Sequence, residues 1–526
     1  SKDGNFGAAV KKDGTIWTWG QNTYGQLCNG TTDTPKTKPI QAGTEGSNTL
    51  VVHKITIDSS IDNTTPMGNI GVYGDNNTFV STVTLRGDDS SATKKFDAFS
   101  ISSVDVSRKF NLNLAVDEEQ YLKANEKLTY QSMNPEIVTV DASGNVRPAH
   151  KGKYGSTVIL IQYNYNDLGV TNTFKGMVRV NIVPYMGIAS PMVAAGGAFT
   201  VALKYDGTVW TWGNNTNGEL GRGDKNSVYS PVQVKSADGN SYLTDIIFVS
   251  AGSNHTLALR KDGTVWAWGL NTYGQLGNNT TTGSSLPVQV KIANGDLNLT
   301  NVVSISAGYQ HNIALRKDGT VWAWGYNAHG ELGIGTAGGD HDHPEQVLRK
   351  ENQSDPDSNN VPLTNIVKIA VGAYHNLALT ADGQVYAWGW GIYGSLGDGD
   401  TSDHSSTVAM RVVGTGYSNN NTNTYLGDGN GSDFIVDIGA GGYSNYASYS
   451  MALDIKGTLY TWGRNYKSAI DPKNTSDSYV TGVPVNITKN NSMLNGAVRI
   501  NSDAIGHTGS VLRSDGQIVS WGYNGY

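Results

Sequence analysis

The sequence has little that could cross-link the chain, span a membrane or bind a polyanion. Cys28 is the one cysteine among 526 residues, which excludes a disulfide within the chain. No apolar run reaches the roughly 18 residues that a membrane helix needs. Charged residues make up only 16% of the chain, the net charge is −7, and no basic run is present. A nucleic-acid partner is therefore not expected, because phosphate binding relies on clustered Lys and Arg.

Motifs of the common enzyme classes are also missing. The chain has no Cys-x-x-Cys, no His-Glu-x-x-His and no phosphate-binding P-loop. It has no Gly-x-Ser-x-Gly elbow of the kind that presents a nucleophilic serine before a helix. We therefore predict no catalytic residue, no organic cofactor and no enzymatic activity.

What the sequence does have is an internal repeat. A Trp-Gly pair closes seven β-rich stretches, and in six of them an Asp-Gly turn comes shortly before it, as Asp262-Gly263 precedes Trp268. Two short β-rich runs joined by Asp-Gly predict a tight hairpin. The tryptophans of these pairs are Trp19, Trp212, Trp268, Trp324, Trp388, Trp462 and Trp521. After a long first interval they recur every 56 to 74 residues or so, a regularity typical of repeat architectures.

Each repeat predicts four strands and no helix, the pattern of a β-propeller blade. The motifs Gly-x-x-His-x-x-Ala-Leu, Asp-Gly-x-Val-Trp-x-Trp-Gly, Asn-x-x-Gly-Gln-Leu-Gly and Pro-x-x-Val follow one another in order. In this order they resemble the RCC1 (regulator of chromosome condensation) repeat over about residues 1–49 and 186–526. The resemblance implies an all-β, seven-bladed RCC1-like β-propeller. Three histidines share one repeat position and are predicted to be structural: His255, His311 and His375.

The long interval between Trp19 and Trp212 predicts an inserted domain. Residues 50–185 contain none of the twelve tryptophans. Alternating strands joined by Gly, Asn and Pro turns predict a β-sandwich there. The stretch 98–183 resembles bacterial Ig-like domains of group 2, whereas 50–97 receives no assignment. The predicted organisation is a first propeller segment at 1–49, an inserted Ig-like β-sandwich region at 50–185, and the remaining blades at 186–526.

Two Asp-rich loops alternate oxygen ligands as calcium loops do. Their residues are Asp398, Asp400 and Asp403 in one loop, and Asp428, Asn430 and Asp433 in the other. Neither loop has the Glu that closes an EF-hand, so a solvated turn is the alternative. The segment His341-Asp-His343-Pro-Glu345 could also bind a metal, but a polar loop before a blade strand is the favoured interpretation. Calcium is thus the ion that the two Asp-rich loops suggest.

The strand count predicts an incomplete blade. Seven hairpins are present, but only six of the strand pairs that should follow them, so one blade should lack two strands. A sheet with a bare edge can pair with another chain. The missing strands are expected from residues outside 1–526 or from a neighbouring subunit, which would build a homopolymeric filament.

Composition and architecture together predict a non-catalytic scaffold at an extracellular, cell-surface or virion location, presenting its loops to a protein or glycan ligand. One alternative is a phage tail or capsid-fibre receptor-binding protein. Another, implied by the resemblance, is guanine-nucleotide exchange, which some RCC1-repeat proteins perform on a small GTPase.

Overall fold

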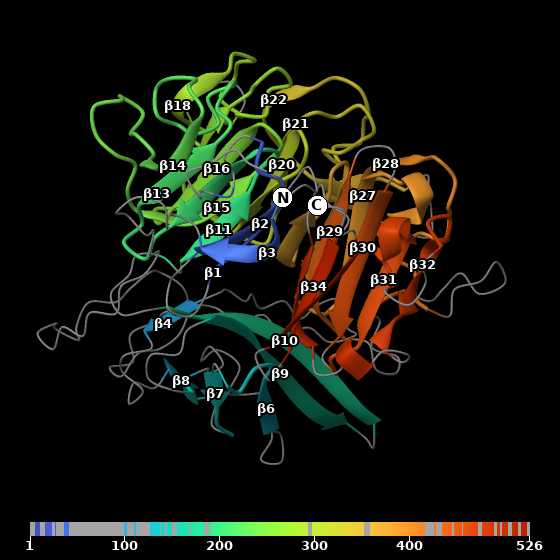
Figure 1. The fold of residues 1–526 in the computed structure, drawn as a ribbon. Coiled ribbons are helices and arrows are strands. Elements are labelled where there is room, and N and C mark those ends of the chain that lie inside the picture. Colours follow the sequence, from blue (N-terminus) through green and yellow to red (C-terminus); the bar gives the residue numbers. More distant parts are fainter. Residues whose placement is uncertain are drawn as a thin grey trace, which may run out of the picture. The chain divides into compact units, whose positions relative to one another are not determined.

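The computed structural model divides the chain into two compact units, residues 1–54 together with 191–526, and residues 55–190 (Figure 1). It describes the following residues: 6–10, 16–23, 27, 36–41, 99–102, 110–111, 127–136, 138–142, 145–149, 155–167, 170–183, 189, 191–292, 297–351, 358–415, 425–427, 434–443, 447–454, 456–471, 476–488, 492–494, 497–502, 508–513 and 517–522. Cys28, the segment 50–97 and the second Asp-rich loop lie outside them.

The first unit is a series of antiparallel repeat sheets. Five of these sheets contain all four strands of a repeat, hydrogen-bonded in chain order. They are β11 (Met192–Ala195), β12 (Phe199–Leu203), β13 (Val209–Gly213) and β14 (Val228–Gln233); β15 (Ile246–Ala251), β16 (His255–Arg260), β17 (Val265–Gly269) and β18 (Ser284–Gln289); β19 (Val302–Ala307), β20 (His311–Arg316), β21 (Val321–Gly325) and β22 (His341–Gln346); β25 (Ile366–Val371), β26 (His375–Thr380), β27 (Val385–Trp390) and β28 (Ser405–Arg411); and β29 (Ile435–Tyr443), β30 (Ala447–Asp454), β31 (Leu459–Arg464) and β32 (Val480–Asn486).

Two more sheets have three described strands each. They are β1 (Phe6–Val10), β2 (Ile16–Gly20) and β3 (Lys36–Gln41), and β33 (Ala497–Ser502), β34 (Thr508–Arg513) and β35 (Ile518–Gly522). The first contains no counterpart of β15, and the last contains no counterpart of β18, among the described residues. The predicted count of seven hairpins and six following strand pairs is confirmed. The prediction that a single blade lacks both missing strands is wrong, because β33 pairs with the last hairpin as β15 pairs with β16.

The hairpins form where the Asp-Gly turns predict them. In the β16–β17 hairpin, the side chain of Asp262 accepts hydrogen bonds from the backbone N–H and the hydroxyl of Thr264. Gly263 takes a φ of 81°, a left-handed conformation that glycine adopts without a steric penalty. Asp206 and Asp318 make the same pair of hydrogen bonds in their own hairpins.

Neighbouring sheets pack face to face along their first two strands. The apolar core therefore lies between sheets: one cluster joins Leu257 and Val265 of the β15–β18 sheet to Ile305 and Trp324 of the next. The turns between first and second strands are also joined from sheet to sheet. The Ser253 N–H donates to the Tyr309 carbonyl, and the Tyr309 N–H donates to the Ala373 carbonyl, both at 3.2 Å.

One repeat sheet is extended beyond its fourth strand. β28 pairs in parallel with β23 (Leu348–Lys350), which in turn pairs with β24 (Asn360–Pro362). The short 3₁₀ turns η2 (Ile392–Gly394), η4 (Tyr466–Ser468) and η6 (Ser492–Leu494) lie in connecting loops.

The second unit contains two sheets. The first has the strand order β4 (Phe99–Ser102), β10 (Val170–Val183), β9 (Gly155–Asp167) and β6 (Lys127–Ser132), with β4 parallel to β10 and the other pairs antiparallel. The second has the order β5 (Phe110–Asn111), β8 (Asn145–Pro148) and β7 (Val138–Val140). No helix found among the described residues of either unit has the length and apolarity to cross a membrane.

Candidate functional site

The tryptophans of the Trp-Gly pairs connect each repeat sheet to the one before it. The indole N–H of Trp268 donates to the Glu219 carbonyl at 2.7 Å, and that of Trp324 donates to the Gln275 carbonyl at 3.0 Å. Trp388, Trp462 and Trp521 donate in the same way to the carbonyls of Glu331, Ser395 and Ala469. Each acceptor lies in the loop that follows the Trp-Gly pair of the preceding sheet. We call each of these tryptophan–carbonyl contacts between neighbouring sheets, with the side chains around it, a junction.

Most of these tryptophans are buried. Trp212, Trp268, Trp324, Trp388 and Trp462 are fully buried, and Trp521 is 9% exposed. Trp19 is only half-buried. The loop glycines pack directly on the indoles, because a Cβ built on Gly277 would lie 2.8 Å from the Trp324 Nε1. A larger residue at that position would push the two sheets apart.

The three repeat histidines are fully buried members of the same junctions. His255 Nε2 lies 2.7 Å from Asn312 Oδ1, and His311 Nε2 lies 2.9 Å from Asn376 Oδ1, so each ring reaches the next sheet. Since Asn312 donates its amide N–H to the Gln275 carbonyl, its Oδ1 must accept from the His255 ring. These contacts hold the two buried rings in place and leave them no route to a substrate.

His375 makes the equivalent connection through serines. Its Nε2 lies 2.9 Å from the Ser450 hydroxyl, and its Nδ1 lies 3.0 Å from the Ser448 hydroxyl. Ser450 donates to the Ser395 carbonyl, so the Nε2–H of His375 is the donor to Ser450. Burial lowers the pKa of His375 to about 4, and the ring is neutral at pH 7.

The first predicted calcium loop does not bring its three carboxylates together. Asp398 Oδ2 lies 2.7 Å from His404 Nε2, Asp400 accepts from the Ser402 backbone N–H, and Asp403 accepts from the Trp390 indole N–H. The pairing with Asp398 raises the pKa of His404 to about 9. Asp398 and Asp400 thus both contact His404, at 2.7 and 4.0 Å, whereas Asp403 contacts Trp390. The residues of the second loop, Asp428, Asn430 and Asp433, lie outside the described residues.

A cluster of aromatic side chains that sequence reasoning missed lies across three neighbouring sheets. We call it the aromatic surface. It consists of Tyr273, Tyr309, Tyr326, His329, Tyr374 and Trp390. Its rings follow one another with centroid distances of 4.2 to 6.2 Å. All except Trp390, which is 8% exposed, are half-buried, so the cluster reaches solvent.

Two buried polar side chains lie beside the aromatic surface. Glu331 Oε2 accepts the His329 backbone N–H at 2.8 Å, while its Oε1 has no hydrogen-bond partner among the described residues. Gln275 Oε1 accepts the Tyr273 backbone N–H at 2.9 Å, and its Nε2 is likewise buried without a partner in that part of the chain. Such groups are rare, since an unsatisfied buried polar atom costs about 1–3 kcal/mol.

Burial shifts the pKa values of several side chains at this site. It raises the pKa of Glu331 to about 8, so this carboxyl is mostly protonated at neutral pH. Burial and the nearby Glu331 raise the pKa of Tyr326 and that of Tyr374. Burial lowers the pKa of His329, and Asp403 opposes that shift.

Comparison with known proteins shows which protein family this chain matches. Residues 162–526 match the model of the RCC1-like domain, and residues 13–56 match that of the RCC1 repeat. The ultraviolet-B receptor UVR8 of Arabidopsis thaliana is 29% identical over 334 residues, which are 63% of this chain and 65% of the receptor. The probable E3 ubiquitin-protein ligase HERC3 of Homo sapiens is 35% identical over 335 residues, 61% of this chain and 29% of the ligase.

Among solved structures, human WBSCR16 is similar with a TM-score of 0.48 and 21% identity, covering 64% of this chain and 77% of that one. The chain spans less than two thirds of the length of the receptor and of the ligase. Ubiquitin ligation is therefore an activity of the whole ligase, and the matched region is not shown to be catalytic.

These relatives correct two predictions. The matched proteins are eukaryotic, intracellular regulators, so the predicted extracellular or virion scaffold, with its phage-fibre alternative, is wrong, and so is the predicted extracellular location. The error has a physical reason: low charge and a polar surface favour solubility in any compartment and do not report location. A glycan ligand and a homopolymer find no support among the relatives.

Proposed function

The chain belongs to the RCC1-like family, and from that premise we propose that it is an intracellular, non-catalytic regulator that binds a partner protein at its aromatic surface. Curated relatives with matched propeller regions are a receptor and ubiquitin ligases, which must recognise other molecules. The proposal commits to one type of partner: a protein segment that presents an arginine or lysine side chain.

The unsatisfied Oε1 of Glu331, a carboxyl close enough to Tyr326 and Tyr374 to raise their pKa, is the observation that carries this proposal. A guanidinium or ammonium group stacked over aromatic faces gains about 0.5–2 kcal/mol. A hydrogen bond from that cation to the carboxylate would satisfy the buried oxygen as well. Because Glu331 is fully buried, the side chains that cover it must move aside to admit the cation. The acidic groups that face the site from neighbouring loops, Asp340 and Asp403, add further attraction for a cation.

Two finer architectural statements belong to the same proposal. We propose that the two three-stranded sheets are separate blades, which gives a seven-bladed propeller, because each has its own Trp-Gly hairpin. We also propose that residues 50–185 form an inserted Ig-like domain between propeller segments 1–49 and 186–526. Its four-stranded and three-stranded sheets support that assignment.

The experiment uses two synthetic peptides as probes, one with a central arginine flanked by glycines and one with citrulline, its neutral isostere. Binding is followed by tyrosine fluorescence as a function of pH. Because the cation must ionise Glu331, affinity for the arginine peptide should rise about tenfold per pH unit up to the pKa of about 8 and then level off. The titratable side chains that interact with the Glu331 carboxyl are Tyr326, Tyr374 and Asp340, and the His329 backbone N–H donates to it.

Glu331→Gln should abolish both the arginine preference and the pH dependence, whereas Glu351→Gln, an exposed carboxylate remote in sequence, should change neither. Equal binding of the arginine and citrulline peptides, or a pH dependence that survives in Glu331→Gln, would refute the proposal.

A further inference from the structure

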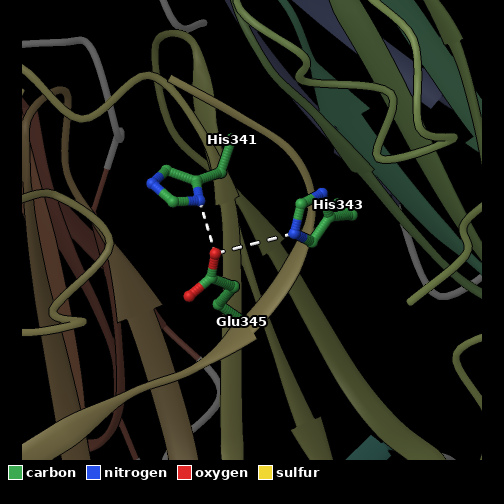
Figure 2. A group of neighbouring side chains, drawn as sticks. All are labelled: His341, His343 and Glu345. Carbon is green, nitrogen blue, oxygen red and sulfur yellow. Dashed lines mark ion pairs between the residues drawn. The ribbon is translucent and has the colours of Figure 1, made fainter. Parts of the chain in front are cut away.

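Two histidines and a glutamate lie together on strand β22, apart from the aromatic surface and from the junctions (Figure 2). His341, His343 and Glu345 alternate in the sequence of β22. The pairing of β22 with β21 shifts register between His341 and Glu345, and the three side chains still converge. Their ligand atoms lie within 4.8 Å of one another, and all three residues are half-buried. Among the described residues, no other group of three His, Cys, Asp or Glu side chains has this geometry.

The three side chains converge on one carboxylate oxygen. His341 Nδ1 lies 2.6 Å from Glu345 Oε1, and His343 Nε2 lies 3.6 Å from the same oxygen. Figure 2 shows both rings turned toward the carboxylate. In a tetrahedral site with bonds of 2.0–2.2 Å, neighbouring ligand atoms are about 3.3 Å apart. Small side-chain rotations would bring the three atoms to that spacing.

A fourth residue fixes the orientation of one ring. His343 Nδ1 lies 2.8 Å from Asp342 Oδ1, so the Nδ1–H donates to that carboxylate. In a neutral ring this leaves the lone pair on Nε2, the atom that faces Glu345. A lone pair directed at a carboxylate oxygen is repulsive unless a cation lies between them. A carboxylate behind a ligating histidine is the usual arrangement at protein metal sites.

The backbone of the strand is held from two sides. β22 pairs with β21, with His341 opposite Gly325 and Glu345 opposite Ala323. On the other side, the Asn279 N–H of the preceding sheet's loop donates to the Asp342 carbonyl at 2.9 Å. A Cβ on Gly274 would lie 2.4 Å from the Asp342 Cα, so glycine is needed for this close approach. The ligand set is therefore positioned before any ion binds.

We propose that His341, His343 and Glu345 bind a divalent transition-metal ion of the zinc type, with Asp342 orienting His343. Imidazole and carboxylate are ligands that suit Zn²⁺, and two histidines with one carboxylate leave a further coordination position open. In the ion-bound form His341 Nδ1 coordinates the metal and the ring proton resides on Nε2. The site lies on the fourth and outermost strand of its sheet, so the ion can enter from solvent.

The test uses the full chain, freed of metal with a chelator and titrated with Zn²⁺ by calorimetry and with Co²⁺ by visible absorption. The wild-type chain should bind a single tight equivalent, and Co²⁺ should give the absorption of a low-coordinate site. Asp342→Asn should weaken Zn²⁺ binding about 10–100-fold while keeping the stoichiometry. His343→Ala and Glu345→Gln should weaken it further.

His404→Ala is the matched control, because His404 also contacts carboxylates but lies in a different loop, and it should leave Zn²⁺ binding unchanged. Glu345→Gln and Asp342→Asn preserve side-chain volume, so the test remains decisive even if His343→Ala fails to fold. Failure of the wild-type chain to bind Zn²⁺, or binding that Glu345→Gln and Asp342→Asn leave intact, would overturn the proposal.

Discussion

The junction at the Glu219 carbonyl offers a direct measurement of how neighbouring sheets are held together. This buried oxygen accepts two hydrogen bonds from the next sheet, from Trp268 Nε1 at 2.7 Å and from Thr256 Oγ1 at 3.1 Å. The preceding sheet has Phe199 at the position of the repeat histidine, so no imidazole contributes here. Thr256→Val and Trp268→Phe each remove one donor with a modest change in shape.

The expected free-energy changes follow from the number of donors left. Thr256→Val should lower the free energy of unfolding by about 0.5–1.5 kcal/mol, because Trp268 still satisfies the carbonyl. Trp268→Phe loses a hydrogen bond and some packing volume and should cost about 1–3 kcal/mol. In the double variant the carbonyl loses both donors, so an additional cost of about 1–2 kcal/mol is expected beyond the sum of the single changes.

The assay is urea unfolding followed by far-ultraviolet circular dichroism, with equal m values required so that the same cooperative unit is compared. Thr211→Val provides the control, because Thr211 is also fully buried but donates to the Leu220 carbonyl, one residue further along. Its effect should add to that of Trp268→Phe. Additivity within about 0.5 kcal/mol for the Thr256 and Trp268 pair would refute the shared-acceptor reasoning.

Three further predictions follow from buried charges and histidines. The pKa of His375 is about 4 in the folded chain and 6.5 in the unfolded chain. Its neutral ring therefore stabilises the fold above about pH 6.5, by up to about 3 kcal/mol, and this stability is lost as the pH falls through 4. His375→Asn should flatten the pH dependence of urea unfolding between these pH values. Asp437→Asn removes the buried partner of Lys368 and should cost about 3–5 kcal/mol by the same assay. Protonated His404 stabilises the fold below about pH 6.5, and this stability is lost as the pH rises through its folded pKa of about 9. Asp398→Asn should lower the pKa of His404, measured by NMR, toward 6.5.

The hairpins could be predicted from the sequence because their cause is local. An Asp followed by Gly and Thr is enough to form the turn, and the aromatic run after it favours a strand. The junction acceptors could not be predicted, since a backbone carbonyl has no signature among side chains. The repeated Trp268 and His311 indicated that something is shared between blades, but the sequence could not name the partner atom.

The aromatic surface was missed because its members come from several different repeat positions. Tyr326 and Trp390 each follow a Trp-Gly pair directly, and Tyr273 and His329 each lie five residues after the Trp of such a pair. Tyr309 lies two residues before His311, whereas Tyr374 lies directly before His375. Only the packing of neighbouring sheets brings such offsets together. The placement of His341 was predicted wrongly for another reason. His341 was expected in a polar loop, yet it begins β22, because the outermost strand of a sheet tolerates polar side chains.

The use of a main-chain oxygen at each junction has an evolutionary consequence. Glutamate, glutamine, serine and alanine all supply the acceptor in this chain, so the residue that carries it is open to substitution without loss of the hydrogen bond. At Gln275 and Glu331 the side chain of that same residue lies beside the aromatic surface. Assembly depends on the carbonyl of this residue, and the proposed ligand preference depends on its side chain. A lineage could therefore exchange its binding partner by single mutations while the architecture stays intact.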